Sequence, residues 1–301
     1  MSKIAFVFPG QGSQYVGMAS DLFETSQELM NNANAALGFS LTDIMFNGPM
    51  DALKQTDVTQ PAIFLHSVGL LNKITELKPD MVAGHSLGEY SALVAAGSID
   101  AIDALKLVRT RGEAMLQAGI EQPGTMAAII GLSPEKVDSI CNEISNTDIV
   151  QSANFNSPGQ VVISGSVNGV HKAMSVAKES GAKLVKELVV SGAFHSPLMA
   201  SAKSKLLEKL NATEITDATV PVYANVTAKP VTSSIEIKKL LFEQLSAPVR
   251  WEETIKNMIA DGVTEFYEIG PGKVLQGLIK RIDKNVKTFG IDKLADLEKI
   301  R

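Results

Sequence analysis

Apolar and polar positions along the chain predict strands that alternate with helices. Residues 4–8 form an uninterrupted apolar run that ends at Pro9-Gly10, which is typical of a strand buried on both faces of a parallel sheet. Residues 16–37 carry apolar side chains at close to the helical period, and residues 61–74 predict another helix with Pro61 in its first turn. Further elements are expected at residues 81–83, 87–96 and 101–117 and, towards the end of the chain, at 197–210, 220–224, 235–245, 253–260, 265–269, 273–280 and 286–290. This alternation predicts an α/β layer architecture.

The order of the elements changes after Gln122-Pro123-Gly124. From there the pattern predicts one strand, one helix, two strands, one helix and a last strand, at residues 126–130, 134–143, 149–155, 160–164, 167–180 and 183–188. The turn-rich Asn156-Ser157-Pro158-Gly159 suits a hairpin between the two middle strands. Because the order βαββαβ is that of a ferredoxin-like unit, we predict such a domain at residues 124–190, inserted into an α/β domain made of residues 1–123 and 191–301.

Composition and charge argue against several classes of protein. Hydrophobic residues make up 45% of the 301 residues and charged residues 20%, as in an ordinary globular protein. The net charge is −5 and no run of Lys and Arg is longer than two residues, which argues against a nucleic-acid partner. No apolar stretch approaches the length of about 18 residues that a membrane span needs, and the first residues lack the apolar stretch of a signal peptide. With Cys141 as the single cysteine, these features predict a cytoplasmic protein.

A candidate nucleophile lies in Gly84-His85-Ser86-Leu87-Gly88, which matches the G-x-S-x-G pattern of a nucleophile elbow. Such an elbow is a sharp turn from a strand to a helix, and it exposes the serine hydroxyl above the edge of the sheet next to free N–H groups of the helix. The predicted strand before Ser86 and the predicted helix after it favour this interpretation, and with it an α/β-hydrolase-like fold for the larger domain. The alternative is a structural turn in which Ser86 caps the helix.

A nucleophilic serine needs a general base, and the chain has four histidines. His66 lies in an apolar segment that suits a core histidine, His171 lies at the start of a polar helix, and His85 adjoins Ser86 in a turn that points successive side chains apart. His195 lies in a glycine-containing loop that leads into a helix, a common position for catalytic groups. By elimination His195 is the candidate base, although no Asp or Glu lies near it in the sequence.

Taken together, these features are similar to those of the malonyl-CoA:acyl carrier protein transacylases, over nearly the whole chain. The resemblance rests on Phe8-Pro9-Gly10-Gln11-Gly12-Ser13-Gln14, Gly84-His85-Ser86-Leu87-Gly88-Glu89-Tyr90, Arg111-Gly112, Asn154-Phe155-Asn156-Ser157-Pro158-Gly159-Gln160, Ala193-Phe194-His195-Ser196 and Glu268-Ile269-Gly270-Pro271-Gly272-Lys273-Val274-Leu275.

The resemblance implies roles for five residues in acyl transfer. Ser86 is implied to be the nucleophile and His195 its general base. The backbone N–H groups of Gln11 and Leu87 are implied to form the oxyanion hole. Gln244 is implied to supply a carbonyl group that orients His195 in place of a carboxylate, so that the tautomer is fixed but the imidazolium is stabilised less.

An arginine is implied to select the substrate. A planar guanidinium can bind the free carboxylate of a malonyl group through two parallel hydrogen bonds. The helical spacing leaves Arg109 and Arg111 as equal candidates, because both flank the predicted apolar face. Only the resemblance, through Arg111-Gly112, favours Arg111. Phe194 before His195 is similarly implied to favour malonyl over methylmalonyl donors.

The resemblance also implies the partners of the chain. Malonyl-CoA is the expected substrate, no cofactor is expected to be bound permanently, and phosphopantetheine is carried by an acidic acyl carrier protein that binds transiently. A basic patch for this partner is expected among Lys183, Lys186, Lys273, Lys280 and Arg281. No dinucleotide site is expected, since Tyr15 replaces the third glycine of G-x-G-x-x-G, and no residues have the spacing of metal ligands.

Three alternatives remain from the sequence. A serine esterase or thioesterase predicts a carboxylate behind His195 and gives Arg111 no role. An acyltransferase that serves a polyketide synthase shares the chemistry but uses another carrier protein. A catalytically inactive scaffold is disfavoured because Ser86, His195, Arg111 and Gln11 are all present.

Overall fold

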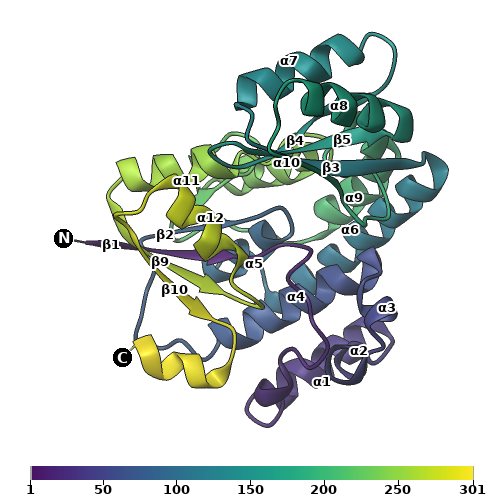
Figure 1. Cartoon of the computed structure of the whole chain (residues 1–301). Helices are drawn as coiled ribbons and strands as arrows, with labels where there is room; N and C mark the ends of the chain where they lie inside the picture. The colour runs from purple at the N-terminus through teal and green to yellow at the C-terminus, as the bar shows by residue number, and fades with distance from the viewer. Residues whose placement is uncertain (1, 301) are drawn as a thin grey trace.

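The computed structural model describes residues 2–300, and its centre is a six-stranded sheet with the order β10-β9-β1-β2-β7-β8 (Figure 1). The strands are β1 (Lys3–Phe8), β2 (Met81–Gly84), β7 (Val222–Tyr223), β8 (Pro230–Val231), β9 (Val263–Ile269) and β10 (Lys287–Ile291). Neighbours from β10 to β7 pair in parallel, and β8 pairs antiparallel with β7. The chain therefore has a mixed α/β architecture around a largely parallel sheet, as the alternation of elements predicted.

Helices cover both faces of this sheet, which explains the apolar run of β1. The helices outside the second sheet described below are α1 (Gln27–Leu37), α2 (Leu41–Asn47), α3 (Met50–Leu53), α4 (Thr56–Leu71), α5 (Gly88–Ala95), α6 (Ala101–Glu121), α9 (Ala200–Ala212), α10 (Ser234–Gln244), α11 (Trp251–Ala260) and α12 (Val274–Ile282). Ala5 and Val7 pack in a cluster with residues of α11 and α12. Phe6 and Phe8 point to the other face and pack in the cluster that contains α4, α5 and α6. A strand between two helical layers has no polar face, hence the continuous apolar pattern.

Helix α4 is buried over nearly its whole length in the core. The predicted start of this helix is wrong, because α4 begins at Thr56 and Pro61 lies in its second turn rather than its first. A proline at this position cannot donate a hydrogen bond to the carbonyl group of Asp57 one turn earlier. That carbonyl group accepts a hydrogen bond from Arg109 Nη1 of α6 instead. Within residues 2–300, no helix combines the length and apolar character that crossing a membrane requires.

The helix predicted at residues 16–37 forms only in its second half. Before α1 the chain makes turns and the short 3₁₀ helix η1 (Ser20–Leu22). Gly17 and Ala19 have φ angles of 94° and 59°, in the left-handed region that ends regular helix. Helices α2 and α3 were missed by the sequence patterns, since they have only 7 and 4 residues and too few turns to show a period.

A second sheet, antiparallel and four-stranded, has the order β4-β5-β3-β6. Its elements are β3 (Gly124–Ile130), α7 (Pro134–Ile144), β4 (Val150–Ser157), β5 (Gln160–Ser166), α8 (Val167–Glu179) and β6 (Leu184–Glu187), and we call residues 124–187 the small-sheet unit. Helices α7 and α8 pack on one face, where Ala127 and Ile129 of β3 point. Met126 points to the opposite face and joins the core of the rest of the chain. Figure 1 shows α7 and α8 on the outer side of this unit.

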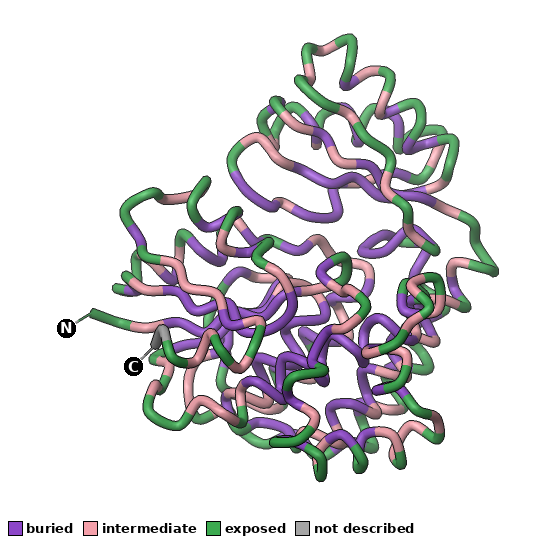
Figure 2. The backbone as a smooth tube through the Cα atoms, turned by 60° about the horizontal axis from the view of Figure 1, so that its bottom comes forward, coloured by how far each residue is buried: buried purple, intermediate pink, exposed green. Residues whose placement is uncertain are grey.

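The small-sheet unit is hydrogen-bonded to the rest of the chain. The backbone N–H of Phe155 in β4 donates to the carbonyl group of Val249, and the N–H of Val249 donates to the carbonyl group of Ala153, at 2.9 and 2.8 Å. Figure 2 shows buried backbone running through both sheets, with exposed backbone on the outside. The face of the second sheet that lacks α7 and α8 therefore lies against the part of the chain that carries the parallel sheet.

The close approach of α5 to β1 leads to a prediction about stability. A Cβ atom on Gly88 would lie 2.1 Å from the carbonyl oxygen of Phe8, whereas a Cβ atom on Gly277 in α12 would meet nothing within 4 Å. We expect Gly88→Ala to lower the free energy of unfolding by about 3 kcal/mol, because rigid backbone must move. The matched control Gly277→Ala should raise it by about 0.8 kcal/mol through helix propensity. Urea unfolding measures both, and equal effects would contradict the assigned packing.

Candidate active site

The turn between β2 and α5 holds Ser86 in a left-handed conformation, with φ at 53°. A residue with a side chain adopts this conformation only at an energetic cost, and such strain is common at reacting groups. Glycines on either side make the turn possible: a Cβ atom on Gly84 would lie 1.8 Å from the carbonyl carbon of Gly88. The turn lies at the carboxyl end of the sheet, where Phe8 of β1 is level with Gly84 of β2.

Asn225, directly after β7, ties the two sides of this turn together. Its Oδ1 accepts a hydrogen bond from the backbone N–H of Ser86, and its Nδ2 donates to the carbonyl oxygen of Gly84, both at 2.6 Å. The N–H of Ser86 is therefore occupied and does not point at a substrate. The sequence did not predict this role for Asn225, although its position directly after a short apolar strand was a usable signal.

His195 is placed to act on Ser86. Its Nε2 lies 2.8 Å from Ser86 Oγ, and its Nδ1 lies 2.8 Å from the main-chain carbonyl oxygen of Gln244. Because a carbonyl oxygen only accepts, Nδ1 carries the ring proton, and Nε2 is left to accept the proton of the Ser86 hydroxyl. The backbone of His195 also has a positive φ, 56°, and its carbonyl oxygen is held by Gln151 Nε2 at 2.7 Å.

Burial keeps His195 neutral. Its side chain is inside the protein, and desolvation, aided by the positive charge of Arg111, lowers the pKa of His195 to about 3. The imidazole is consequently unprotonated across the physiological range and is ready to take a proton. Its partner behind Nδ1 is a neutral carbonyl group rather than the carboxylate of a hydrolase triad.

Arg111 of α6 lies on the other side of Ser86. Its Nη2 donates to Ser86 Oγ at 3.0 Å and to Gln244 Oε1 at 2.9 Å, and its Nη1 donates to Gln60 Oε1 at 2.7 Å. Arg111 is 1% exposed, and its Nε has no acceptor within hydrogen-bond distance among residues 2–300. Arg109, the other candidate, instead forms ion pairs with Asp57 and Glu113 away from this centre.

A cavity of about 130 Å³ opens onto these groups. It is lined by Ser86, His195 and Arg111 together with Gln11, Leu87 and Phe194. Among residues 2–300, the backbone N–H groups of Gln11 and Leu87 have no hydrogen-bond acceptor. Leu87 directly precedes α5, so its N–H belongs to the positive end of the helix dipole.

The comparisons with known proteins agree with this geometry. Residues 5–292 match the family model described as acyl transferase domain. The chain belongs to this acyl transferase family. A relative named malonyl CoA-acyl carrier protein transacylase, from Bacillus subtilis, is 47% identical over 304 residues, which cover 99% of this chain and 96% of the relative.

Two solved structures of acyl transferases are similar along their whole length. An acyl carrier protein S-malonyltransferase from Vibrio cholerae superposes with a TM-score of 0.95 at 42% identity, covering 100% of both chains. A malonyl-transacylase solved in complex with a type II polyketide synthase acyl-carrier protein superposes with a TM-score of 0.94 at 41% identity, covering 99% of this chain and 98% of that one.

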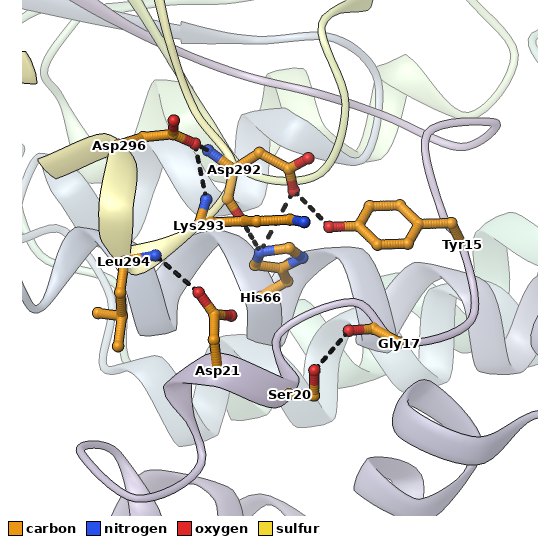
Figure 3. Close-up of polar contacts among 9 residues, drawn as sticks. All are labelled: Tyr15, Gly17, Ser20, Asp21, His66, Asp292, Lys293, Leu294 and Asp296. Atoms are coloured by element: carbon orange, nitrogen blue, oxygen red, sulfur yellow. Dashed lines mark hydrogen bonds and ion pairs between the residues drawn. The ribbon is translucent and has the colours of Figure 1, made fainter.

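The other three histidines of this acyl transferase have different partners. His85 Nε2 lies 2.8 Å from Asn156 Oδ1, and His171 lies on the surface beside Glu187. His66 is fully buried, as expected of a core histidine, and contacts the C-terminal segment: its Nε2 is 2.8 Å from the carbonyl oxygen of Asp292. Figure 3 shows this contact together with Tyr15, whose hydroxyl group donates to Asp292 Oδ1.

The five basic residues expected to form one patch lie in or next to two elements, β6 and α12, and the patch stays a prediction. Lys183 and Lys186 lie at the β6 edge of the small-sheet unit, and α12, which carries Lys280 and Arg281, contacts β4. Arg281 Nη1 also donates to Gln160 Oε1. Within residues 2–300, no three or more His, Cys, Asp or Glu side chains are arranged to hold a metal ion.

The lowered pKa of His195 leads to a prediction about pH. Since the group is already neutral well below pH 6.5, its ability to accept a proton is retained as pH falls towards 5. We expect a neutral fluorophosphonate to label Ser86 at pH 5 within about twofold of the rate at pH 8, whereas a base with an ordinary pKa would lose roughly tenfold per unit below 6.5. A rate that titrates near 6.5 would contradict this, and Ser86→Ala should remain unlabelled.

Proposed function

We propose that this acyl transferase moves a malonyl group from malonyl-CoA to the phosphopantetheine thiol of an acyl carrier protein, through a malonyl ester on Ser86. The observation that carries the proposal is the position of Ser86 Oγ, within hydrogen-bond distance of both His195 Nε2 and Arg111 Nη2. A base on one side activates the hydroxyl, and a buried cation on the other suits an acyl group that ends in a carboxylate. The relatives named above supply the substrate class.

In the first half-reaction Ser86 Oγ attacks the thioester carbonyl carbon while His195 Nε2 takes the hydroxyl proton. The negative charge that develops on the carbonyl oxygen is stabilised by the N–H groups of Gln11 and Leu87. The tetrahedral intermediate then collapses, and coenzyme A leaves as a thiol after receiving the proton from His195. In the second half-reaction the thiol of the carrier protein gives its proton to His195 and attacks the malonyl ester. Ser86 Oγ then leaves and takes the proton from His195, which restores the free hydroxyl group.

The free carboxylate of the malonyl group binds Arg111 in this proposal. Gln60 and Gln244 hold the plane of the guanidinium, while Nε remains without an acceptor. We expect the carboxylate to accept a hydrogen bond from Nη2 in place of Ser86 Oγ, because the two hydrogens of Nη2 are otherwise used by Ser86 and Gln244. Phe194 lines the same cavity, where it limits the space for a branched acyl group.

We also propose that the active site lies between two domains, an α/β-hydrolase-like domain of residues 1–123 and 191–301 and a ferredoxin-like domain of residues 124–190. In support, the order β4-β5-β3-β6 with α7 and α8 on one face is what a ferredoxin-like unit would have. The elbow between β2 and α5 is typical of hydrolase-like sheets. Met126 and Asn154 of the small-sheet unit line the same cavity as Ser86.

The alternatives differ in how well they fit the site. An esterase or thioesterase is disfavoured, because the partner of His195 Nδ1 is the main-chain carbonyl group of Gln244 and, among residues 2–300, no carboxylate takes that place. The alternative in which the acyl acceptor is a carrier protein of a polyketide synthase is still supported, because one similar structure was solved with such a partner. The two acceptors share every step at Ser86.

The covalent step leads to a direct test. We expect the protein incubated with malonyl-CoA to gain the mass of one malonyl group, located on Ser86 by peptide mass spectrometry. Ser86→Ala should gain none, because the attacking oxygen is missing. Rapid release of free malonate without an adduct would contradict a transferase and favour a hydrolase.

The role of Arg111 leads to a second test. Arg111→Ala should lower kcat/KM for malonyl-CoA by about 100-fold, since a charge-assisted contact of about 2–3 kcal/mol is lost, and should leave acylation by acetyl-CoA nearly unchanged. The matched control is Arg109→Ala on the same helix, whose ion pairs lie away from the cavity. If both variants keep the preference for malonyl-CoA, Arg111 does not bind the carboxylate.

A further inference from the structure

Glu89, the second residue of α5, is a buried carboxylate that the reaction described above does not use. It is 3% exposed. Its Oε2 accepts hydrogen bonds from the backbone N–H of Asn225 at 3.0 Å and from Gln244 Nε2 at 2.8 Å. A carboxylate is rarely buried to this extent unless a cation compensates it.

The side-chain amide of Gln244 connects Glu89 to Arg111. On one side Gln244 Nε2 donates to Glu89 Oε2, and on the other Gln244 Oε1 accepts from Arg111 Nη2 at 2.9 Å. The two charged partners fix the direction of the amide, because its nitrogen must face the carboxylate and its oxygen the guanidinium. The dipole of the Gln244 amide is therefore aligned between the two groups and stabilises both the negative charge of Glu89 and the positive charge of Arg111.

Arg111 has no carboxylate in direct contact within residues 2–300. Its hydrogen-bond acceptors are Gln60, Gln244 and Ser86, all neutral. A guanidinium stays protonated even when buried, so its charge needs compensation from nearby. The titratable groups coupled to its charge are Tyr90 and Glu89, both on α5, and His195, which is neutral. Tyr90 has its pKa raised to about 12 by burial and is neutral, which leaves Glu89.

We propose that Glu89 is the resting counter-charge of Arg111, held to it through Gln244, and that the carboxylate of an incoming malonyl group replaces it while Glu89 takes up one proton from solvent. This inference rests on the proposed function, in which Arg111 binds the acyl carboxylate. Two carboxylates cannot both be compensated by one buried guanidinium, so that binding of the second favours protonation of the first.

The surroundings of Glu89 allow such a change of protonation near neutral pH. Burial raises the pKa of Glu89 to about 7, while the hydrogen bonds from Asn225 and Gln244 and the charge of Arg111 act in the opposite direction. When a malonyl carboxylate neutralises Arg111, the last of these effects is lost and the pKa rises further. Above pH 7 malonyl binding then takes up a proton and weakens as pH rises, whereas well below pH 7 Glu89 is already protonated and binding no longer depends on it.

Isothermal titration calorimetry tests this directly. Malonyl-CoA is titrated at pH 8 into Ser86→Ala, which binds without turnover, in buffers of different ionisation enthalpy that report the number of protons taken up. Acetyl-CoA is the control, since it carries the same coenzyme A phosphates without the carboxylate. We expect a larger proton uptake with malonyl-CoA than with acetyl-CoA. Equal uptake for the two ligands overturns the proposal without the need for any Glu89 variant.

The double variant Ser86→Ala, Glu89→Gln removes the charge but keeps an acceptor for Asn225 and Gln244. We expect the extra proton uptake to vanish and malonyl-CoA to bind about fivefold more tightly at pH 8, because the competing negative charge is gone. The matched control Glu113→Gln, in the same Ser86→Ala background, removes a surface carboxylate of α6 paired with Arg109 and should behave as Ser86→Ala alone. An uptake that persists in the Glu89 variant also overturns the proposal.

The outcome separates this inference from the proposed function. If the unmodified protein forms a malonyl ester on Ser86 but the two ligands show equal proton uptake, the function stands and the role of Glu89 is refuted. If no malonyl ester forms and Ser86→Ala binds both ligands equally, the function itself fails.

Discussion

The hydrogen bond between Ser86 Oγ and His195 Nε2 is the contact on which the rest of the site depends. Both residues have a positive φ, a conformation that their own backbones disfavour. Each is held by its surroundings: Ser86 by the glycines of the turn and by Asn225, and His195 by the carbonyl group of Gln244 and by Gln151. The strain is therefore located at the two reacting groups, and packing and hydrogen bonds elsewhere offset it.

The second constraint on the site is its charge. Arg111 is buried among neutral acceptors, and the nearest compensating carboxylate is one amide away. A direct salt bridge would occupy the donors that an acyl carboxylate needs, whereas an indirect one keeps the guanidinium oriented and still available. His195 likewise has an uncharged partner, the carbonyl group of Gln244, and its ring is neutral when no substrate is bound.

The sequence predicted the local parts of this arrangement better than the distant ones. The elbow around Ser86 and most strands and helices follow from short patterns of apolar residues and glycines. The choice between Arg109 and Arg111 could not follow from helical spacing, because both flank the apolar face and only contacts with Gln60 and Gln244 of other helices distinguish them. Asn225 acts on Ser86, 139 positions away, and Glu89 reaches Arg111 through Gln244, 155 positions away; no local pattern encodes such contacts.

The cavity is lined by residues from both sheet-containing parts of the chain, and these residues have different functions. Ser86 comes from the carboxyl end of the parallel sheet and His195 from the loop after β6, while Met126 and Asn154 supply a wall from the small-sheet unit. Asn154 on that wall lies between Ala153 and Phe155, whose main-chain groups are hydrogen-bonded to Val249. Asn156 of the same strand contacts His85 of the turn. Substitutions at Met126 or Asn154 can therefore change the shape of the acyl pocket without replacing either residue that contacts Ser86 Oγ.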